Sequence, residues 1–575
     1  MAILSSLAES LRVPSQSRAV SNVWINDDIR PLPPHRRTWT RWAYISFWAI
    51  NQIAISNWQL GASLVALGLS VWQAVVALVL GKLATAAVAV LNGYVGAEWH
   101  VGFPVVSRFV WGVYGQYFIL VQRIVLSLVW FAVQSWTGGL CMQNILAAVF
   151  PSYQNMRNHF PESAHMDTKQ FVGWVLFNIL MIPILWFKPE RLRFAILYMN
   201  IISAITLICI MIWCLSTSHG AGSLLSAPAT VQGSSELGWG IVSATTAVIG
   251  SIAVGLTNQP DYSRFARRPG DQVMGQYSSI ILLGIVMPFF GCLASSASRE
   301  IYGEAVWNPP DLVQNWLDTT YSPGARAAAF FAGFGLVVCQ LAINTIDNAF
   351  SAGMDMAGLM PTYIDIRRGA YIGLVLSIAM CPWVLLSSAG VFISVLSAYS
   401  VFLGPIVGIM VCEYWVLRKR KIKLSDLYHP AKSGVYYYWN GNGLFYLVFY
   451  HIAHLIIIRT GVNLRAFASW VIGFSYLIPG FVHNINPAIE VPAACTNLYS
   501  LAFPLGFAVS FLVHWGVNNV VPPPGLAETD GVDYYSTFTS DEAARLGITP
   551  GDVLVGEEHV TGDIEKDLGV KADTV

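Results

Sequence analysis

Long apolar segments recur along most of the chain and are separated by short polar loops. Many reach about 20 residues, the length at which an α-helix crosses the hydrocarbon core of a bilayer. Because only helices and closed barrels satisfy their backbone hydrogen bonds there, the pattern predicts an all-α polytopic membrane protein. We expect about twelve transmembrane helices, at residues 43–67, 72–97, 116–148, 170–188, 193–215, 238–259, 275–297, 325–352, 369–389, 391–415, 465–484 and 498–517.

Two of these spans, the first and the sixth, are interrupted by polar residues and glycines. The first contains Asn51, Gln52, Ser56, Asn57 and Gln59, and the sixth contains Gly250, Gly255 and the sequence TNQPD at 257–261. Their separation by five helices fits two inverted five-helix repeats with broken helices 1 and 6. Such breaks free backbone groups to bind substrate and ions near the middle of the membrane. The alternative is that the small polar residues serve helix packing.

The third span carries an aromatic and an amide side chain on one face. Trp130 and Gln134 are four residues apart, so they stack on the same side of a helix. An indole stacks on a flat heterocycle, and a primary amide both donates and accepts hydrogen bonds. An unpartnered Gln is costly in hydrocarbon, so this face should meet protein or an aqueous cavity. The pair predicts a substrate site, with simple helix packing as the alternative.

The eighth span contains a carboxylate well inside an apolar segment. Asp347 lies there between Asn344 and Asn348, which are four residues apart. A carboxylate at that depth is costly unless it is paired, protonated or exposed to an aqueous path. Asp347 and Asn344 are therefore candidates for ion coupling, with a structural hydrogen bond to a neighbouring amide as the alternative.

Composition agrees with a membrane protein and argues against several other classes. The 575 residues are 55% hydrophobic and 11% charged, whereas soluble domains carry about 25% charged residues. A net charge of zero suggests neither nucleic acid nor an acidic partner. The eight cysteines are scattered without a CxxC pair, so we expect no metal site and no disulfide framework.

Basic residues predict the topology and the domain organisation. If the N-terminus is inside, one side of the membrane receives Arg36, Arg37, Arg108, Lys188, Arg191, Arg193, Arg264, Arg267, Arg268, Arg367, Arg368 and the basic run at 418–423. The positive-inside rule then places both termini in the cytoplasm. We expect a cytoplasmic N-terminal tail at 1–42, a transporter domain at 43–518 and an acidic C-terminal tail at 519–575. That tail is poor in apolar residues and should be flexible, with at most a short docked element.

Several sequence motifs resemble one transporter family. They are FWAINQIAISNW at 47–58, GYVGAEWHVGFPVVSRFVWGVYG at 93–115, VWFAVQSWTGG at 129–139, PDYSRFA at 260–266, NAFSAGMDM at 348–356 and SAYSVFLGPIVGIMVCEYW at 397–415. In order and spacing, the chain resembles the uracil/allantoin permease branch of the nucleobase–cation symporter family. The resemblance covers about residues 24–518 and implies a twelve-span fold built on a ten-helix core of inverted repeats.

The resemblance also assigns roles by matched position. Trp130 would stack on the substrate, and Gln134 and Asn348 would hydrogen-bond the heterocycle. Ile252 stands where the family usually has Trp or Lys, so one pocket contact is missing here. Asp28 and Trp39 match an N-terminal stretch implicated in cytoplasmic gating, although a solvated tail is the alternative reading.

The coupling ion can be argued by comparison with sodium-coupled relatives. These relatives hold Na⁺ partly through hydroxyls in the eighth span, where this chain has Ala342 and Ile343. A hard cation needs several oxygen ligands, so that site looks dismantled. A proton needs only a titratable group, and Asp347 offers one. We therefore expect proton symport.

Residues 442–461 do not fit the family pattern. This apolar block, NGLFYLVFYHIAHLIIIRTG, stands between the tenth span and the eleventh, and removing it restores the usual join. We interpret it as an atypical insertion from a retained intron. The alternative is a real interfacial or re-entrant helix, since His451 and His454 interrupt the apolar run.

The predicted function is proton-coupled import of uracil, allantoin or uric acid across the plasma membrane. Its partners would be the heterocycle, a proton and membrane lipids, with ubiquitin-ligase machinery acting at Lys566 or Lys571 as a further expectation from the resemblance. Alternatives are another family substrate (cytosine or purine, a nucleoside, thiamine) or a non-transporting nutrient sensor. No metal-binding cluster, nucleophile elbow or phosphate loop occurs in the sequence, so no cofactor and no enzymatic activity are expected.

Overall fold

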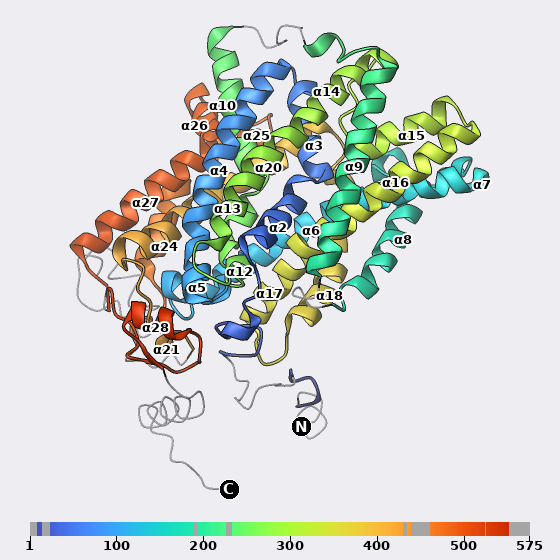
Figure 1. Ribbon diagram of the computed structural model, residues 1–575. Coiled ribbons are helices and arrows are strands. Elements are labelled where there is room, and N and C mark those ends of the chain that lie inside the picture. The colour runs from blue at the N-terminus through green and yellow to red at the C-terminus, as the bar shows by residue number, and fades with distance from the viewer. Residues whose placement is uncertain are drawn as a thin grey trace.

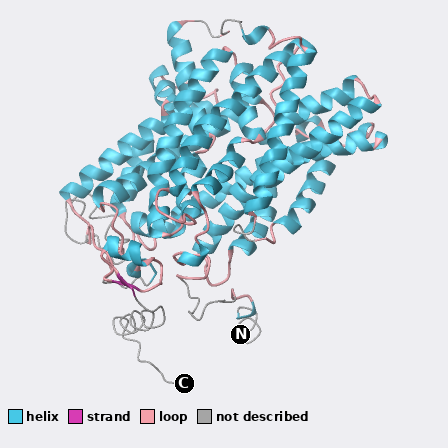
Figure 2. Ribbon diagram, in the orientation of Figure 1, coloured by secondary structure: helices cyan, strands magenta, loops and turns pink. Residues whose placement is uncertain are grey.

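A computed structural model describes residues 9–13, 24–187, 192–225, 230, 233–428, 434–438, 461–523 and 525–550. Helices dominate this part of the chain, and the single two-stranded sheet lies near its C-terminal end (Figure 2). The long helices run roughly side by side, with the connecting helices α5 (Phe103–Trp111), α21 (Ser425–Tyr428) and α28 (Ser540–Leu546) gathered at one end of the molecule (Figure 1).

In chain order the first half contains α2 (Arg41–Gln52), α3 (Ile55–Ala66), α4 (Val71–Trp99), α5 (Phe103–Trp111), α6 (Gln116–Val149), α7 (Pro151–Gln154), α8 (Thr168–Ile184), α9 (Arg193–Thr217), α10 (Ser234–Gly250), α11 (Ala253–Thr257), α12 (Gln259–Ser263), α13 (Asp271–Tyr277) and α14 (Gly284–Tyr302). The second half contains α15 (Pro309–Thr319), α16 (Pro323–Ile343), α17 (Phe350–Leu359), α18 (Ile366–Ser377), α19 (Pro382–Leu385), α20 (Ala389–Val411), α21 (Ser425–Tyr428), α24 (Leu464–Ser475), α25 (Ile478–Ile485), α26 (Ala493–Ser500), α27 (Ala502–Val520), β1 (Val532–Asp533), α28 (Ser540–Leu546) and β2 (Thr549–Pro550).

Both predicted breaks are present. The first span is divided at Ile53 and Ala54, where the Ala54 backbone is extended with φ −127° and ψ 151°. The sixth span is divided after Gly250, with Ser251 and Ile252 between α10 and α11. The expectation of broken helices 1 and 6 is thus confirmed.

Among the described residues, six helices are long and apolar enough to cross a membrane, and two bent pairs, α24 with α25 and α26 with α27, meet the same criterion together. The broken first and sixth spans fall outside that count because each of their pieces is short. Apolar runs of spanning length mark these regions in the sequence, but run length alone does not give the residue at which each helix divides.

Three π-helical segments continue α-helices without a visible sequence signal. They are η5 (Ser278–Leu283) between α13 and α14, η6 (Asn344–Ala349) between α16 and α17, and η8 (Cys412–Leu417) after α20. Single-turn π segments are rare and often occur at functional sites. The segment η6 contains all three polar residues singled out in the eighth span.

The spans pack in two groups around the broken helices. In one group α2 and α3 lie against α13 and α14, while α10 and α12 lie against α4. In the other, α6 packs against α8, α16, α17 and α18. We call the first set, α2, α3, α4, α10, α12, α13 and α14, the bundle group. We call the second set, α6, α8, α16, α17 and α18, the scaffold group.

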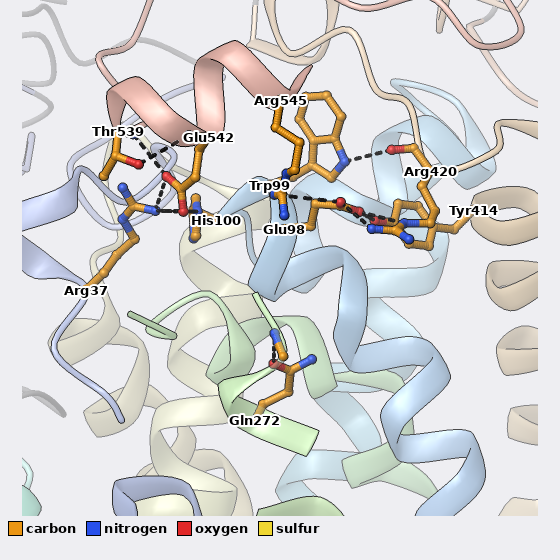
Figure 3. Close-up of polar contacts among 11 residues, drawn as sticks. Arg37, Glu98, Trp99, His100, Gln272, Tyr414, Arg420, Thr539, Glu542 and Arg545 are labelled. Carbon is orange, nitrogen blue, oxygen red and sulfur yellow. Dashed lines mark hydrogen bonds and ion pairs between the residues drawn. The ribbon is translucent and has the colours of Figure 1, made fainter. Parts of the chain in front are cut away.

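The C-terminal tail is more ordered than the sequence suggests. Strands β1 and β2 pair in parallel, and α28 begins with a capping box between Thr539 and Glu542. Glu542 accepts hydrogen bonds from Arg37 at 2.9 and 3.0 Å, and its carboxylate lies 3.5 Å from His100 at the end of α4 (Figure 3). Asp530 is anchored by Ser425, whose hydroxyl donates at 2.5 Å and whose backbone N–H donates at 2.9 Å. Residues 525–550 therefore dock against the body of the protein, which corrects the expectation of a mostly flexible tail for this stretch.

Two interpretations from the sequence lie outside the described residues. The atypical insertion is described only at Gly461, and residues 442–460 are not. Lys566 and Lys571, the expected sites of ubiquitin attachment, also fall outside the described range.

Candidate functional site

A cavity of about 60 Å³, which has room for several water molecules, lies where the two broken helices meet the scaffold group. The residues that line it come from α2, α3, α4, α6, the break of the sixth span, α11, α12, the end of α16 and η6. They are Trp48, Asn51, Ser56, Asn57, Lys82, Trp130, Gln134, Ser251, Ile252, Val254, Gly255, Asn258, Tyr262, Ile343, Asp347 and Asn348. Five of the six residues predicted for substrate binding and ion coupling, all except Asn344, therefore share one cavity.

Trp130 and Gln134 project into the cavity from adjacent turns of α6, as their spacing predicts. Both side chains are almost fully shielded from outside solvent, with exposed fractions of 8% and 3%. The Gln134 amide has no hydrogen-bond partner in the described part of the chain. A buried amide without a partner is costly, so this group is ready to pair with a bound molecule.

Asn348 reaches the cavity from the π-helical segment η6. Its Nδ2 donates to Asn344 Oδ1 at 3.0 Å and lies 3.4 Å from the Trp130 carbonyl. The Asn348 Oδ1 accepts no hydrogen bond from any described residue. Asn344 does not line the cavity; it lies behind Asn348 and orients it, and its own Nδ2 contacts the Met181 sulfur at 3.4 Å.

Ile252 lies at the break of the sixth span and closes one wall of the cavity with an aliphatic side chain. It is 4% exposed and supplies neither an aromatic face nor a hydrogen-bonding group. The position is thus where the resemblance predicts, and the missing polar or stacking contact is a feature of this protein.

Asp347 connects the scaffold group to the bundle group. Asn51, next to the break of the first span, donates to Asp347 Oδ2 at 2.5 Å. Both side chains are only partly buried because they face the cavity. An acidic group that shares a cavity with the substrate-facing amides and bridges the two helix groups is well placed to link ion binding to helix movement.

Lys82 was missed by the sequence reasoning although a signal was present. It is the only charged residue in the predicted span 72–97, and its side chain reaches the cavity from α4. Its ammonium donates to Gln52 Oε1 at 3.1 Å and to Asn57 Oδ1 at 2.9 Å. A lone charge in a spanning helix is a functional candidate by default, and the same argument that selected Asp347 applies to it.

A second buried ionic cluster, also missed, lies about two turns of α6 away from Trp130 toward the beginning of that helix. Arg123 pairs with Asp355 of α17 at 2.5 Å and lies 3.7 Å from Asp261 of α12. Its guanidinium also donates to Ser351 at 2.9 Å. Since α12 belongs to the bundle group and α6 and α17 to the scaffold group, Arg123 holds the two groups together on this side of the cavity.

The N-terminal segment also contacts both helix groups at this end of the molecule. The Asp28 carboxylate accepts from the Ile366 backbone N–H at 3.1 Å, and its carbonyl accepts from Arg264 at 2.8 Å. Trp39 is 3% exposed, forms a backbone bridge with Ala266 and stacks on Phe265 at a centroid distance of 5.2 Å. Both residues are therefore packed between helix ends, and the alternative of a solvated tail is wrong for them.

The site contains the parts of a small-molecule carrier. Among the described residues, no three His, Cys, Asp or Glu side chains gather in a way that could hold a metal ion. The cavity instead combines an indole, side-chain amides, one ammonium and one carboxylate at the junction of two helix groups.

Comparison with known proteins agrees with this geometry. Residues 31–506 match the family described as permeases for cytosine/purines, uracil, thiamine and allantoin. The chain belongs to this family.

Individual relatives span almost the whole protein. Transporter aclS of Aspergillus oryzae is 44% identical over 95% of this chain and 94% of its own length. The thiamine transporter THI72 of Saccharomyces cerevisiae is 30% identical over 95% of this chain and 88% of its own length. Other relatives from the same yeast, at 29–30% identity, are an allantoin permease and a uracil permease.

The fold matches a solved transporter as well. The inward-facing structure of Mhp1 aligns with a TM-score of 0.67 at 18% identity, over 93% of this chain and all of Mhp1. The protein is thus an all-helical, multi-pass membrane transporter of heterocyclic nutrients and not an enzyme. The relatives carry several different substrate names, so family membership leaves the particular heterocycle open.

Proposed function

We propose that this protein is a proton-coupled symporter that imports an uncharged lactam- or ureide-type heterocycle of the uracil, allantoin or uric acid class. The observation that carries the proposal is the cavity shared by Trp130, Gln134, Asn348 and Asp347. Transport needs no covalent step: it needs a central site and alternating access by movement of one helix group against the other.

The substrate class follows from the groups that remain free in the cavity. A flat ring stacks on the Trp130 indole, where offset stacking contributes about 0.5–1.5 kcal/mol beyond buried area. The unpartnered Gln134 amide pairs with alternating N–H and C=O groups on the ring edge, and the Asn348 oxygen accepts a further N–H. Uracil, allantoin and uric acid all present such edges.

The charges in the cavity favour a neutral molecule. Lys82 and Asp347 contribute one cation and one carboxylate to the wall. A cationic ring, such as the thiazolium of thiamine, would meet the Lys82 ammonium in a poorly solvated site, where like charges repel strongly. Ile252 offers such a ring no compensating aromatic face. Thiamine is therefore a less favoured substrate.

Asp347 is the proposed proton carrier. Ala342 and Ile343 supply no side-chain oxygen at the position where sodium-coupled relatives bind Na⁺, whereas Asp347 has direct access to the cavity. Protonation would remove its charge and change the acceptor that Asn51 now meets. Because Asn51 stands beside the break of the first span, this change acts at the junction of the two helix groups.

Asp28 and Trp39 are the proposed gating residues. The hydrogen bonds of Asp28 reach the start of α18 on one side and Arg264 after α12 on the other. These contacts span the scaffold and bundle groups, so they must break or shift when the groups separate. The basic residues Arg37, Arg108 and Arg264 lie at this same end, which supports a plasma-membrane topology with both termini cytoplasmic.

Uptake of radiolabelled uracil, allantoin and uric acid tests the proposal in cells that lack their own permeases for these compounds. We expect saturable uptake of at least one compound, abolished by a protonophore and reduced to background in Asp347→Asn. The exposed Asp318 of α15 provides the matched control, since Asp318→Asn should leave uptake unchanged. A parallel form lacking residues 442–461 tests whether the insertion is tolerated.

Two results would contradict the proposal. Protonophore-insensitive uptake would remove the proton from the mechanism, and undiminished accumulation in Asp347→Asn would remove the assigned carrier. Absence of uptake for all three compounds, despite normal surface expression of both forms, would contradict the substrate class.

A further inference from the structure

Lys82 is a buried cation to which the proposed transport cycle assigns no role. Its side chain is 1% exposed, and its only described hydrogen-bond partners are the amide oxygens of Gln52 and Asn57, at 3.1 and 2.9 Å. These two residues lie on opposite sides of the break at Ile53 and Ala54. The ammonium therefore bridges the two halves of the first span.

The ammonium also determines which way the neighbouring amides point. An ammonium has three donors and no acceptor, so Gln52 and Asn57 must turn their oxygens toward Lys82. Their NH₂ groups are then directed away from it. Gln52 Nε2 donates to Asn51 Oδ1 at 2.6 Å, and Asn57 Nδ2 donates to the Asn51 backbone carbonyl at 2.6 Å.

The orientation of Asn51 follows from these contacts. Because its Oδ1 is occupied by the Gln52 donor, only its NH₂ group remains for Asp347, and it donates to Asp347 Oδ2 at 2.5 Å. A donor of this kind stabilises the ionised carboxylate over the protonated acid. Every hydrogen bond in this series is thus donated in the same direction: from Lys82 to Gln52, from Gln52 to Asn51, and from Asn51 to Asp347.

The seventh span leaves room for this arrangement. A Cβ atom added at Gly284 would lie 2.5 Å from Gln52 Oε1 and 3.0 Å from Lys82 Cδ. Gly284 has φ −70°, so its backbone conformation does not itself require glycine. Glycine at position 284 is explained by the space that the side chains of Lys82 and Gln52 occupy.

We propose that Lys82 is a positioning residue for ion coupling: by fixing the amides of Gln52 and Asn51, it sets the hydrogen bond that Asp347 receives. The inference rests on the proposed role of Asp347 as proton carrier and names Lys82 as the residue that controls the protonation of Asp347. Lys82 makes no described hydrogen bond to Asp347, so it acts on that carboxylate through Gln52 and Asn51.

The direction of the effect follows from the groups around Asp347. Among the described residues that line the cavity, the other titratable groups are Lys82 on α4 and Tyr262 on α12, whose hydroxyl donates to the Ile346 carbonyl. Farther toward the cytoplasmic end, Arg123 is already paired with Asp355 and lies near Asp261. Removing the Lys82 charge frees Gln52 and Asn51 to reverse, and Asn51 can then offer its oxygen to a protonated Asp347.

The test is the pH dependence of uptake in Lys82→Met, measured in intact cells with the transported compound identified by the uptake screen. We expect the external pH for half-maximal uptake to move to a more alkaline value by about one unit, the size of shift that a nearby charge commonly produces. Gly284→Ala, which crowds the same pair while keeping the lysine, should move the profile in the same direction. Thr85→Val, an isosteric change one turn away on α4 and outside the cavity lining, should leave it unchanged.

The outcomes separate this inference from the proposed function. An unaltered pH profile in both Lys82→Met and Gly284→Ala, at normal surface expression, would overturn the positioning role even where Asp347→Asn abolishes accumulation. Complete loss of pH dependence in Lys82→Met would overturn it too, because Lys82 would then carry the proton. If Lys82→Met fails to reach the surface, Gly284→Ala decides. Undiminished accumulation in Asp347→Asn would instead contradict the carrier assignment on which the inference rests.

Discussion

At the scale of single residues, the Gln134 amide is the sharpest indication of a ligand. Other polar groups in the cavity, such as Asn348 and Asp347, have hydrogen-bond partners within the protein, whereas Gln134 has none among the described residues. Its amide therefore contributes little to folding in the empty state. A residue of this kind should be important for binding and dispensable for stability.

Replacement of Gln134 by leucine keeps the approximate shape and removes the amide. We expect the KM for uptake to rise by about 10–100-fold, since each lost hydrogen bond to a ligand costs about 0.5–1.5 kcal/mol and a buried ring edge left unpaired adds to this. Surface expression should stay normal. Gln143→Leu on the same helix, outside the cavity, is the matched control. An unchanged KM in Gln134→Leu would show that the ring binds elsewhere.

Single residues also show how far the sequence predicts the site. Helical spacing and the cost of polar groups in hydrocarbon point to Trp130, Gln134 and Asp347 from the sequence alone. The same cost argument applies to Lys82 and Arg123, each a single charge in a predicted span. The pairing of Asn51 with Asp347 was not predictable, because it depends on how the first span and the eighth meet.

At the scale of elements, the breaks were predictable and the π-helical segment η6 was not. Clusters of glycine and polar residues mark a helix that cannot continue through hydrocarbon, as in the first and sixth spans. A π turn adds one residue to a turn without changing composition, so the sequence around 344–349 reads as an ordinary helix. That added residue shifts which side chains of the eighth span face the cavity.

Close contact between α3 and α14 is a second property of the elements. A Cβ at Gly61 would lie 1.9 Å from the Pro288 carbonyl oxygen, so the two helices touch through their backbones. Small residues permit this approach in membrane proteins. The contact fixes α3, the second half of the broken first span, against the seventh span.

Gly61→Ala should therefore destabilise the transporter. Overpacking a tight contact costs about 1–3 kcal/mol, and here backbone must move against backbone, which gives little relief. The measurement is the melting temperature of the detergent-solubilised protein. Gly516→Ala on α27, where nothing lies within 4 Å of the added Cβ, should be neutral or slightly stabilising because alanine favours helix by up to about 1 kcal/mol. Equal melting temperatures for the two variants would contradict the backbone contact.

At the scale of the whole molecule, the described parts of the two terminal segments, residues 24–40 and 525–550, meet at the end of the protein where Asp28 and Trp39 pack between the helix ends. Arg37 of the N-terminal segment and His100 at the end of α4 both contact Glu542 of α28 (Figure 3). Composition alone suggests a solvated tail, because the tail has few apolar residues. The docking combines buried polar contacts with aromatic ones between segments that are far apart in sequence: Tyr535 packs on Tyr428 at a centroid distance of 5.1 Å, and Phe538 packs on Trp99 at 5.7 Å.

Two titratable groups give this docking contact a pH dependence with a definite sign. Burial alone would raise the pKa of Glu542, but hydrogen bonds from His100, the Thr539 backbone and Arg37 hold that pKa well below its usual range. A lowered carboxyl pKa stabilises docking at every pH above the ordinary value of about 4.3. Burial lowers the pKa of His100 below its usual 6.5; the hydrogen bond to Glu542 opposes this shift only in part, and the charge of Arg37 adds to it. The lowered histidine pKa therefore does not weaken docking above about pH 6.5. Below that pH it weakens docking progressively, because the undocked histidine gains a proton more readily than the docked one.

Acidification should therefore loosen α28 while Glu542 stays ionised. We expect limited proteolysis within residues 530–550 to be constant from about pH 8 to 6.5 and to rise below about 6.5, near the ordinary histidine value. His100→Asn should flatten this dependence, and asparagine is the suitable replacement because His100 has φ 56°, a left-handed conformation that asparagine tolerates. Glu542→Gln should expose the segment at every pH, whereas Asp541→Asn, on an exposed neighbour of the same helix, should behave as wild type. A cleavage rate that remains constant down to pH 5 in the wild-type protein would show that His100 does not govern the docking of the tail.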